Sequence, residues 1–200
     1  MATYQTIAQA LHVPALTVNG SRFIADVSPV VSAEDALAQV DAIRKLWPDA
    51  SHHCWAYRLR HELQTRSSDD GEPGGSAGRP ILAQIDGHDL FDVVVIITRY
   101  FGGTKLGVGG LIRAYGGTAG KALDQAKIKD VQETEALDIT FAYELTKAVE
   151  AVLRAHQITP TKTDFDARVR MRLDVPCEDM STLRDALVQQ TSGRVDFPLA

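Results

Sequence analysis

A glycine-rich window, Val93–Leu123, constrains the fold of this chain more than any other segment. It holds eight of the fifteen glycines and four basic residues, and it holds no acidic residue. Its first part, VVVIITRY, predicts a buried strand, and its later part, LGVGGLIRAY, predicts a helix that follows a glycine-rich turn. Glycines let backbone N–H groups come close to a ligand, and a helix N-terminus attracts anions. The glycines alone would also fit tight packing, but packing does not require the basic residues, which therefore favour an anion-binding surface.

The first fifty residues predict a hairpin and a helix. Asn19-Gly20 lies between two apolar runs and predicts a hairpin over residues 16–25, because this dipeptide fits a two-residue turn with positive φ. Ser32 followed by Asp35 is a variant of the capping box. The helix that begins there is expected to end at Pro48.

Residues 52–123 predict a strand, a loop, a second strand and a helix. The aromatic and small residues of 52–59 predict a strand, whereas residues 67–80 hold four glycines and two prolines and predict a loop. An apolar run over 92–100 predicts a strand that is covered on both faces. The helix that follows is expected over 106–123, interrupted or bordered by Gly116-Gly117.

The second half of the chain, from about residue 133, predicts alternating strands and helices. The order is a strand over 137–141, a helix with Leu145, Val149 and Val152 on one face, strands over 158–163 and 168–175, a helix with Met180, Leu183 and Leu187 on one face, and a closing strand over 194–197. This β-α-β-β-α-β order is the ferredoxin-like pattern. We therefore expect an α+β protein, with an N-terminal domain over 1–130 and a ferredoxin-like domain over 131–200.

The composition is that of an ordinary soluble globular protein. A net charge of −5 argues against general coating of nucleic acid but leaves room for a local basic patch. Cys54 and Cys177 form no CxxC pair, as expected of a reduced chain without disulfides. The N-terminal segment lacks a secretory signal, and no stretch approaches the roughly 18 apolar residues of a membrane span. We expect a cytoplasmic protein that does not bind a membrane.

An acidic loop precedes the glycine-rich window. Asp69, Asp70 and Glu72 lie within four positions, and Arg79 follows. These carboxylates could bind a hard cation or act as acid and base groups. They could also cap a helix that begins near Ser76 and pair with the basic window, and we favour this structural role because no EF-hand spacing is present. We therefore expect no metal and no cofactor.

Neither the histidines nor the glycines match a known catalytic or nucleotide motif. Strand alternation places His52 and Cys54 on one face and His53 on the other, so Cys54 and His53 cannot readily cooperate, and no HxxxH or CxxC would complete a zinc site. The window has no Walker A sequence, and Ile112 stands where a dinucleotide motif requires its third glycine. Packing or hydrogen bonding is the favoured role of the histidines and Cys54.

Three arginines, Arg168, Arg170 and Arg172, alternate with apolar residues in the second half. They could follow a phosphate backbone. A solvated sheet face with acids on neighbouring strands explains them equally simply, and the acidic balance of this half favours that explanation.

Three segments resemble the signature of the IMPACT family: HCWAY at 53–57, SDDGEPGGSAGRPIL at 68–82 and VVVIITRYFGGTKLGVGGLIRAY at 93–115. The resemblance is greater to its bacterial YigZ-type branch, which carries a ferredoxin-like C-terminal domain. It implies an N-terminal domain like the second domain of ribosomal protein S5, and a pair of domains similar in kind to the last two domains of translocation-type elongation factors. The family loop usually reads Glu-Pro-Ser-Gly-Thr-Ala-Gly; here Gly74 and Ser76 replace the Ser and Thr, which weakens any role of the first hydroxyl.

The resemblance also implies a regulatory role, because eukaryotic relatives act in translational control by blocking activation of a starvation-responsive kinase on ribosomes. We predict a cytosolic regulatory protein that binds RNA or the ribosome through its glycine-rich basic surface, without DNA specificity. The residues predicted to bind the anion or nucleic acid are Arg79, Arg99, Tyr100, Phe101, Gly102, Gly103, Lys105 and Arg113. The loop acids Asp69, Asp70 and Glu72 would orient these basic side chains or discriminate against other partners.

Two other functions remain open from the sequence. The chain could be a protein-interaction module that binds no nucleic acid. It could also be an enzyme that acts on a small phosphorylated substrate in the same cleft, with Asp70 or a neighbouring carboxylate as acid and base.

Overall fold

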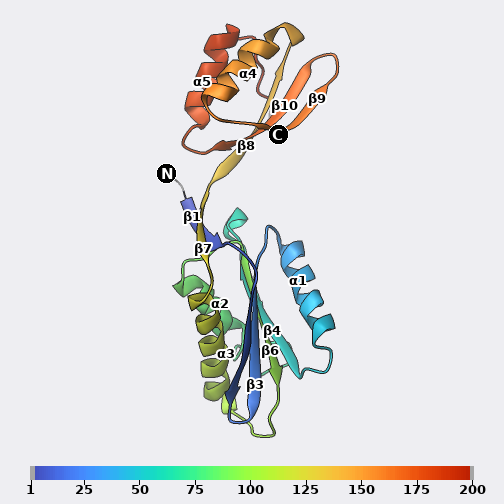
Figure 1. The fold of residues 1–200 in the computed structure, drawn as a ribbon, viewed down its shortest axis with the longest axis vertical. Coiled ribbons are helices and arrows are strands. Elements are labelled where there is room, and N and C mark those ends of the chain that lie inside the picture. The colour runs from blue at the N-terminus through green and yellow to red at the C-terminus, as the bar shows by residue number, and fades with distance from the viewer. Residues whose placement is uncertain (1–2, 199–200) are drawn as a thin grey trace. The chain divides into compact units, whose positions relative to one another are not determined.

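The structure is a computed structural model that describes residues 3–198 and divides into two units (Figure 1). The N-terminal unit comprises Tyr4–Val131, and the C-terminal unit comprises the chain from Gln132 onward together with Thr3. Both units combine helices with antiparallel sheets, which confirms the predicted α+β class.

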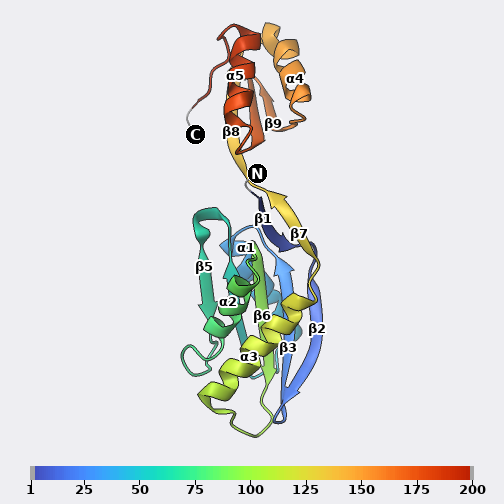
Figure 2. The same cartoon turned by 90° about the vertical axis from the view of Figure 1, so that its left-hand side faces the viewer.

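The N-terminal unit is built around a five-stranded antiparallel sheet with the order β2-β3-β6-β4-β5. Its strands are β1 (Thr3–Ile7), β2 (Leu11–Val18), β3 (Ser21–Pro29), β4 (His52–Arg58), β5 (Thr65–Ser68), β6 (Val93–Tyr100) and β7 (Ile128–Gln132). Its helices are α1 (Ala33–Leu46), α2 (Gly78–Gly87) and α3 (Gly107–Asp124), with a short 3-10 turn, η1, at His61–Leu63. Helix α1 covers one face of the sheet, and α2 and α3 cover the other (Figures 1 and 2).

The hairpin and the first helix agree with the sequence prediction. Asn19 and Gly20 have φ angles of 45° and 81°, and they join β2 to β3 as a two-residue turn requires. The Ser32 hydroxyl accepts a hydrogen bond from the Asp35 N–H at 3.1 Å and caps α1. The helix ends at Leu46, two residues before Pro48.

Central strand β6 is buried on both faces, as its apolar run predicts. Val93, Val95 and Ile97 face α2 and α3, and they pack with an edge-to-face pair formed by Phe23 and Tyr115 at 5.1 Å between ring centroids. Val94 and Ile96 face α1.

Helix α3 runs without interruption through Gly116-Gly117, which differs from the sequence expectation. Packing does not require either glycine, since a Cβ at Gly117 would meet open space and a Cβ at Gly116 would make an ordinary contact with Pro80 at 3.6 Å. At Gly120, a Cβ would lie 2.6 Å from Oε1 of Gln84 on α2, and the Gln84 side chain would have to move. The loop before α2 is also shorter than the predicted 67–80, because β5 includes residues 67 and 68 and α2 begins at Gly78, two residues after Ser76.

Strands β1 and β7 form a separate two-stranded sheet that the sequence did not indicate. The Gln5 side-chain amide donates to Asp130 Oδ1 at 3.1 Å, and the Ala8 N–H donates to the Lys127 carbonyl at 2.7 Å. These strands lie more than a hundred residues apart in the sequence, so local patterning carries no signal for their pairing.

The C-terminal unit has the predicted ferredoxin-like element order. Its elements are β8 (Thr134–Phe141), a 3-10 turn η2 (Tyr143–Leu145), α4 (Thr146–Ala155), β9 (Pro160–Phe165), β10 (Val169–Pro176) and α5 (Met180–Thr191). The sheet order is β8-β10-β9, and α4 and α5 pack on one face of it (Figure 2). The predicted closing strand is reduced to a single antiparallel bridge between Asp196 and Thr140.

Candidate functional site

The three family-like segments meet in one buried polar cluster of the N-terminal unit. Cys54 comes from β4, Glu72 from the loop before α2, Arg99 from β6 and Tyr115 from α3. We call these four residues, with Ser21 at the start of β3, the buried cluster. They converge because Cys54 and Arg99 point to the same sheet face, on which α2 and α3 pack.

A buried ion pair forms the centre of the cluster. Arg99 Nη1 lies 2.5 Å from Glu72 Oε1, and both side chains are 5 % exposed. The Tyr115 hydroxyl donates to the same carboxylate oxygen at 2.7 Å, and Arg99 Nη2 donates to Ser21 Oγ at 3.1 Å. Two further hydrogen bonds therefore stabilise this buried charge pair, while Arg99 Nε has no hydrogen-bond partner among the described residues.

The burial of Arg99 changes its assigned role. The sequence predicts that Arg99 contacts a phosphate, but the structure encloses its guanidinium against Glu72 and beside the Phe23 ring, 5.4 Å from Cζ. The acidic loop does orient a basic side chain here, through Glu72. Arg99 therefore lies beneath the predicted anion-binding surface and is not exposed on it.

Asp69 organises the acidic loop. Its carboxylate accepts hydrogen bonds from the N–H groups of Gly75, Ala77 and Gly78 at 2.7 to 2.9 Å, at the point where α2 begins. Burial by itself would raise the pKa of Asp69, but these three bonds and the nearby Arg79 guanidinium lower it below the usual value. This arrangement matches the capping role weighed from the sequence.

Asp70 ties the loop to β4 and α1. One carboxylate oxygen accepts from the His53 N–H at 2.7 Å, and the other accepts from Arg44 at 2.8 Å. The Asp70 carbonyl lies 2.8 Å from Nδ1 of His52. Asp70 therefore holds the loop in place, and both of its carboxylate oxygens are used by the protein itself.

Burial makes the cluster unreactive. It raises the pKa of Cys54 to about 12, and the neighbouring carboxylates of Glu72, Asp70 and Asp69 act in the same direction. The pKa of Tyr115 is likewise raised, first by burial and then by Cys54 and Glu72. A thiol that stays protonated near neutral pH is no nucleophile, so the cluster is better suited to holding structure than to covalent catalysis.

The two histidines lie on opposite faces, as strand alternation predicts. His52 faces the cluster, with Nε2 3.9 Å from Glu72 Oε1. His53 lies against α1, where Nε2 is 3.1 Å from the Trp47 carbonyl, and burial lowers its pKa below the usual value. Among the side chains that the structure describes, no group of three or more His, Cys, Asp or Glu is arranged to hold a metal ion.

The remaining basic residues of the window lie on the surface. Phe101, Gly102, Gly103 and Lys105 form the exposed loop between β6 and α3, and Arg113 is exposed on α3. We call this loop, the first turns of α3 and Arg113 the basic surface. Phe101 is 49 % exposed, and its ring lies 5.6 Å from Cζ of Arg99, so the buried cluster supports the loop directly.

The N-terminus of α3 is open to solvent and has no side-chain cap. Leu106 precedes the helix without capping it, and the first turn, which begins at Gly107, contains no acid. Arg113 extends back over this turn: its Nη1 lies 3.6 Å from the position that a Cβ at Gly109 would occupy. The guanidinium and the unpaired helix N–H groups therefore share one location, which suits an anion.

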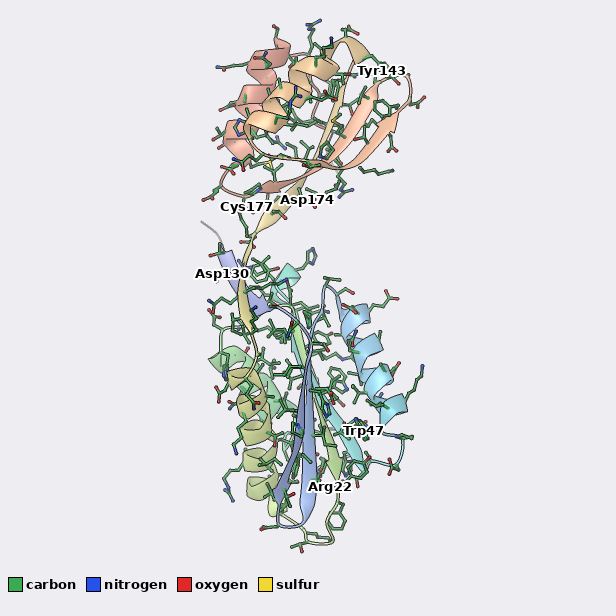
Figure 3. All side chains as sticks on the ribbon, viewed as in Figure 1. Arg22, Trp47, Asp130, Tyr143, Asp174 and Cys177 are labelled. Atoms are coloured by element: carbon green, nitrogen blue, oxygen red, sulfur yellow. The ribbon has the colours of Figure 1, made fainter. Side chains whose placement is uncertain are left out.

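A pocket of 330 Å³ adjoins this turn, between the β2–β3 hairpin and α3. Its lining includes Asn19 from the hairpin tip and Arg113 and Lys121 from α3. Arg22 also lies at this end of the sheet, with its Cζ 4.6 Å from the centre of the Tyr100 ring (Figure 3). The sequence analysis did not include Arg22 and Lys121 among the site residues. Arg22 is the cross-strand partner of Tyr100, which was included, so the pairing of β3 with β6 would have identified it.

Packing accounts for one of the loop glycines. A Cβ at Gly102 would lie 1.9 Å from the Gly20 carbonyl carbon, so the loop and the hairpin turn touch backbone to backbone. Gly103, in contrast, has a φ of 85° and open space around it. Packing therefore explains Gly102, whereas the backbone conformation with positive φ explains Gly103.

Tyr100 and Arg79 have contacts with other parts of the N-terminal unit. The Tyr100 hydroxyl donates to Asp49 at 2.9 Å, so its phenol is occupied within the protein. Arg79 is exposed at the start of α2, and its Cδ lies 3.5 Å from where a Cβ at Gly75 would be. Arg79 thus accompanies the acidic loop rather than the first turn of α3.

With this geometry established, comparison with known proteins decides the family. The "Impact N-terminal domain" profile matches residues 19–123, and the profile "Domain of unknown function (DUF1949)" matches residues 139–194. The chain belongs to the IMPACT family. Among IMPACT relatives, it is 32 % identical to "IMPACT family member YigZ" of Escherichia coli over 90 % of this chain and 90 % of that protein.

Other IMPACT comparisons agree with this assignment. The chain is 40 % identical to "IMPACT family member in pol 5'region" of Thermus thermophilus, over 80 % of this chain and 86 % of that protein. A crystal structure of a hypothetical protein superposes with a TM-score of 0.81 at 30 % identity, and the match covers 100 % of this chain and 98 % of that one. Within the described part of this IMPACT chain, no helix combines the length and apolar character of a membrane span.

Proposed function

We propose that this protein is a cytosolic regulator of translation that binds RNA, free or within the ribosome, through the basic surface of its N-terminal unit. The observation that carries the proposal is the position of Arg113 over the uncapped first turn of α3. A phosphate placed there would accept hydrogen bonds from helix N–H groups and from the guanidinium together. Family membership supports a regulatory role, since the IMPACT resemblance implies translational control.

Other residues of the basic surface, and Arg22 on β3, fit a nucleic-acid backbone and an exposed base. Lys105 and Arg22 are exposed at the same end of the sheet, near the loop and the hairpin. The half-exposed Phe101 ring is available for stacking, which every base permits because every base has a π-face. The Tyr100 ring already lies against Arg22, so Phe101 is the better stacking residue.

Arg99 and the loop acids act in this proposal as support. The buried cluster fixes the start of the loop at Phe101, and the Ser21 hydroxyl that pairs with Arg99 also accepts from the Gly102 N–H at 3.2 Å. A rigid support reduces the entropy lost when the surface binds a partner.

Ribosome co-sedimentation tests the proposal. The variant Lys105→Glu/Arg113→Glu should lose co-sedimentation, since it reverses two charges at the proposed phosphate site. The matched control is Lys45→Glu/Lys129→Glu, which makes the same change in net charge at two exposed lysines elsewhere in the N-terminal unit. Equal sedimentation of both variants would contradict the proposal.

A protein partner is the second candidate, and exposed apolar side chains favour it. Val108 and Ile112 are 54 % and 42 % exposed on α3, beside Phe101 on the neighbouring loop. Apolar surface of this kind is typical of protein interfaces. Binding to a protein through these side chains would change little with salt, and Val108→Ser/Ile112→Ser would weaken it more than Lys105→Glu/Arg113→Glu does.

A further inference from the structure

The sheet of the C-terminal unit has one face that no helix covers. Helices α4 and α5 pack on the opposite face, where the apolar residues of β8 and β10 form the core (Figure 2). On the uncovered face, side chains of the three strands line a trough of 630 Å³, and Asp196 and Pro198 also belong to its lining. Sites for small ligands commonly have a volume of this order, about 300–1,000 Å³.

Most charges in the trough neutralise one another. The pairs are Arg168 with Asp196 at 2.6 Å, Lys162 with Asp164 at 2.9 Å and Arg172 with Asp138 at 4.0 Å. Because each of these bases has a carboxylate beside it, they supply little net attraction for a ligand. These pairs confirm the acidic neighbours expected from the sequence on either side of the arginine row.

Arg170 is the exception. It lies on the middle strand, β10, with Thr140 of β8 and Asp164 of β9 opposite it in register. Within residues 3–198, the Arg170 guanidinium makes no hydrogen bond or ion pair, and the Thr140 hydroxyl makes no hydrogen bond. Arg170, with an unpaired guanidinium, and Thr140, with an unused hydroxyl, are thus cross-strand neighbours in the lining of the trough.

We propose that this trough binds a small organic anion, whose carboxylate or phosphate group is held by the Arg170 guanidinium and the Thr140 hydroxyl. A planar guanidinium binds either group through two parallel hydrogen bonds. The three carboxylates in the lining would repel a polyanion, whereas a single anionic group matches the one unpaired base. The lining includes no aromatic ring among the described residues, so stacked bases have no platform there.

This site is separate from the proposed RNA surface, because it is built entirely from residues of the C-terminal unit. It assigns a ligand-binding role to the domain that follows the Impact N-terminal domain. Loss of RNA binding through the basic surface would leave it unchanged.

Solution NMR on the full chain tests the site. The backbone amides of Thr140 and Arg172 are followed while inorganic phosphate, or succinate in a second series, replaces sodium chloride at constant ionic strength. We expect saturable shifts with at least one anion, at least tenfold weaker binding in Arg170→Gln and about threefold weaker binding in Thr140→Val. Saturation by phosphate alone identifies a phosphate site, and saturation by succinate alone identifies a carboxylate site.

The matched control is Arg154→Gln, which removes an exposed arginine from α4 and should bind like the wild type. Non-saturable shifts with both anions, or equal binding by Arg170→Gln and Arg154→Gln, would overturn the proposal. A labelled oligouridylate that binds through Arg170, while phosphate and succinate do not, would also overturn it and would make the trough a polyanion surface.

Discussion

Two arginines of the glycine-rich window, Arg99 and Arg113, lie in opposite environments. Arg99 is buried; it pairs with Glu72, to which the Tyr115 hydroxyl also donates, and it donates a hydrogen bond to Ser21. Arg113 is exposed and reaches toward an uncapped helix N-terminus. The basic residues of one segment are therefore not equally available to a ligand. The buried Arg99 stabilises the fold, and only exposed residues such as Arg113 can bind a partner.

The largest expected effect on stability concerns the buried ion pair of Arg99 and Glu72. Glu72→Ala leaves the Arg99 charge enclosed without its carboxylate, and it should lower the free energy of unfolding of the N-terminal unit by about 3–5 kcal/mol. Urea unfolding followed by tryptophan fluorescence measures this unit alone, because Trp47 and Trp55 both belong to it. The control Glu34→Ala, at an exposed acid on α1, should cost less than about 1 kcal/mol, and an equal loss in both variants would contradict the account.

Asp69→Asn should have the next effect, a loss of about 2 kcal/mol, because asparagine has one uncharged acceptor oxygen in place of the two carboxylate oxygens that accept from Gly75, Ala77 and Gly78. The folded pKa of Asp69 lies below its unfolded value of 3.8, so the carboxylate stabilises the fold fully above that pH. Its contribution decreases as the pH falls through the folded pKa. Urea midpoints of the two proteins should therefore converge on acidification below about pH 4; a constant difference would show that the charge of Asp69 is not responsible.

Two glycine substitutions compare a packed and an open position of the window. Gly102→Ala places a methyl group against the Gly20 backbone and should cost about 1–3 kcal/mol. Gly117→Ala meets open space in the middle of α3 and should stabilise the unit by up to about 1 kcal/mol, because alanine favours the helix. Thermal unfolding of both variants checks the opposite signs, and two losses of similar size would show that the glycine at 117 has another role.

The smallest expected effect on stability concerns the exposed side chains of Lys105 and Arg113. Lys105→Gln/Arg113→Gln should change the free energy of unfolding by no more than about 0.5 kcal/mol, because neither side chain is buried. Urea unfolding under the conditions used for Glu72→Ala provides the comparison. A loss above about 2 kcal/mol would place these residues among those that hold the fold.

The sequence predicts much of the fold because its strongest signals are local. Asn19-Gly20 fixes the turn, Ser32 caps α1, and the apolar run of β6 marks a strand covered on both faces. The pairing of β1 with β7 and the single bridge at Asp196 depend on contacts between distant residues, which no local pattern encodes.

The candidate site could be predicted only in part. The segments that form it were identified, but the burial of Arg99 was not. A signal for it exists, since a charge in a strand covered on both faces must be buried and needs a partner, and Glu72 was among the nearby acids. The position of Arg113 over Gly109 depends on a side-chain conformation that spacing alone does not fix.

The salt dependence of RNA binding tests the central claim most directly. Affinity of the full chain for a single-stranded oligonucleotide is measured over a series of salt concentrations, for the wild type and for Lys105→Gln/Arg113→Gln. If both side chains bind phosphates, the slope of log K against log salt should fall by about 1.4, which is about 0.7 for each phosphate that the variant no longer neutralises. An unchanged slope, or wild-type binding that does not depend on salt, would contradict the assignment of the basic surface to RNA.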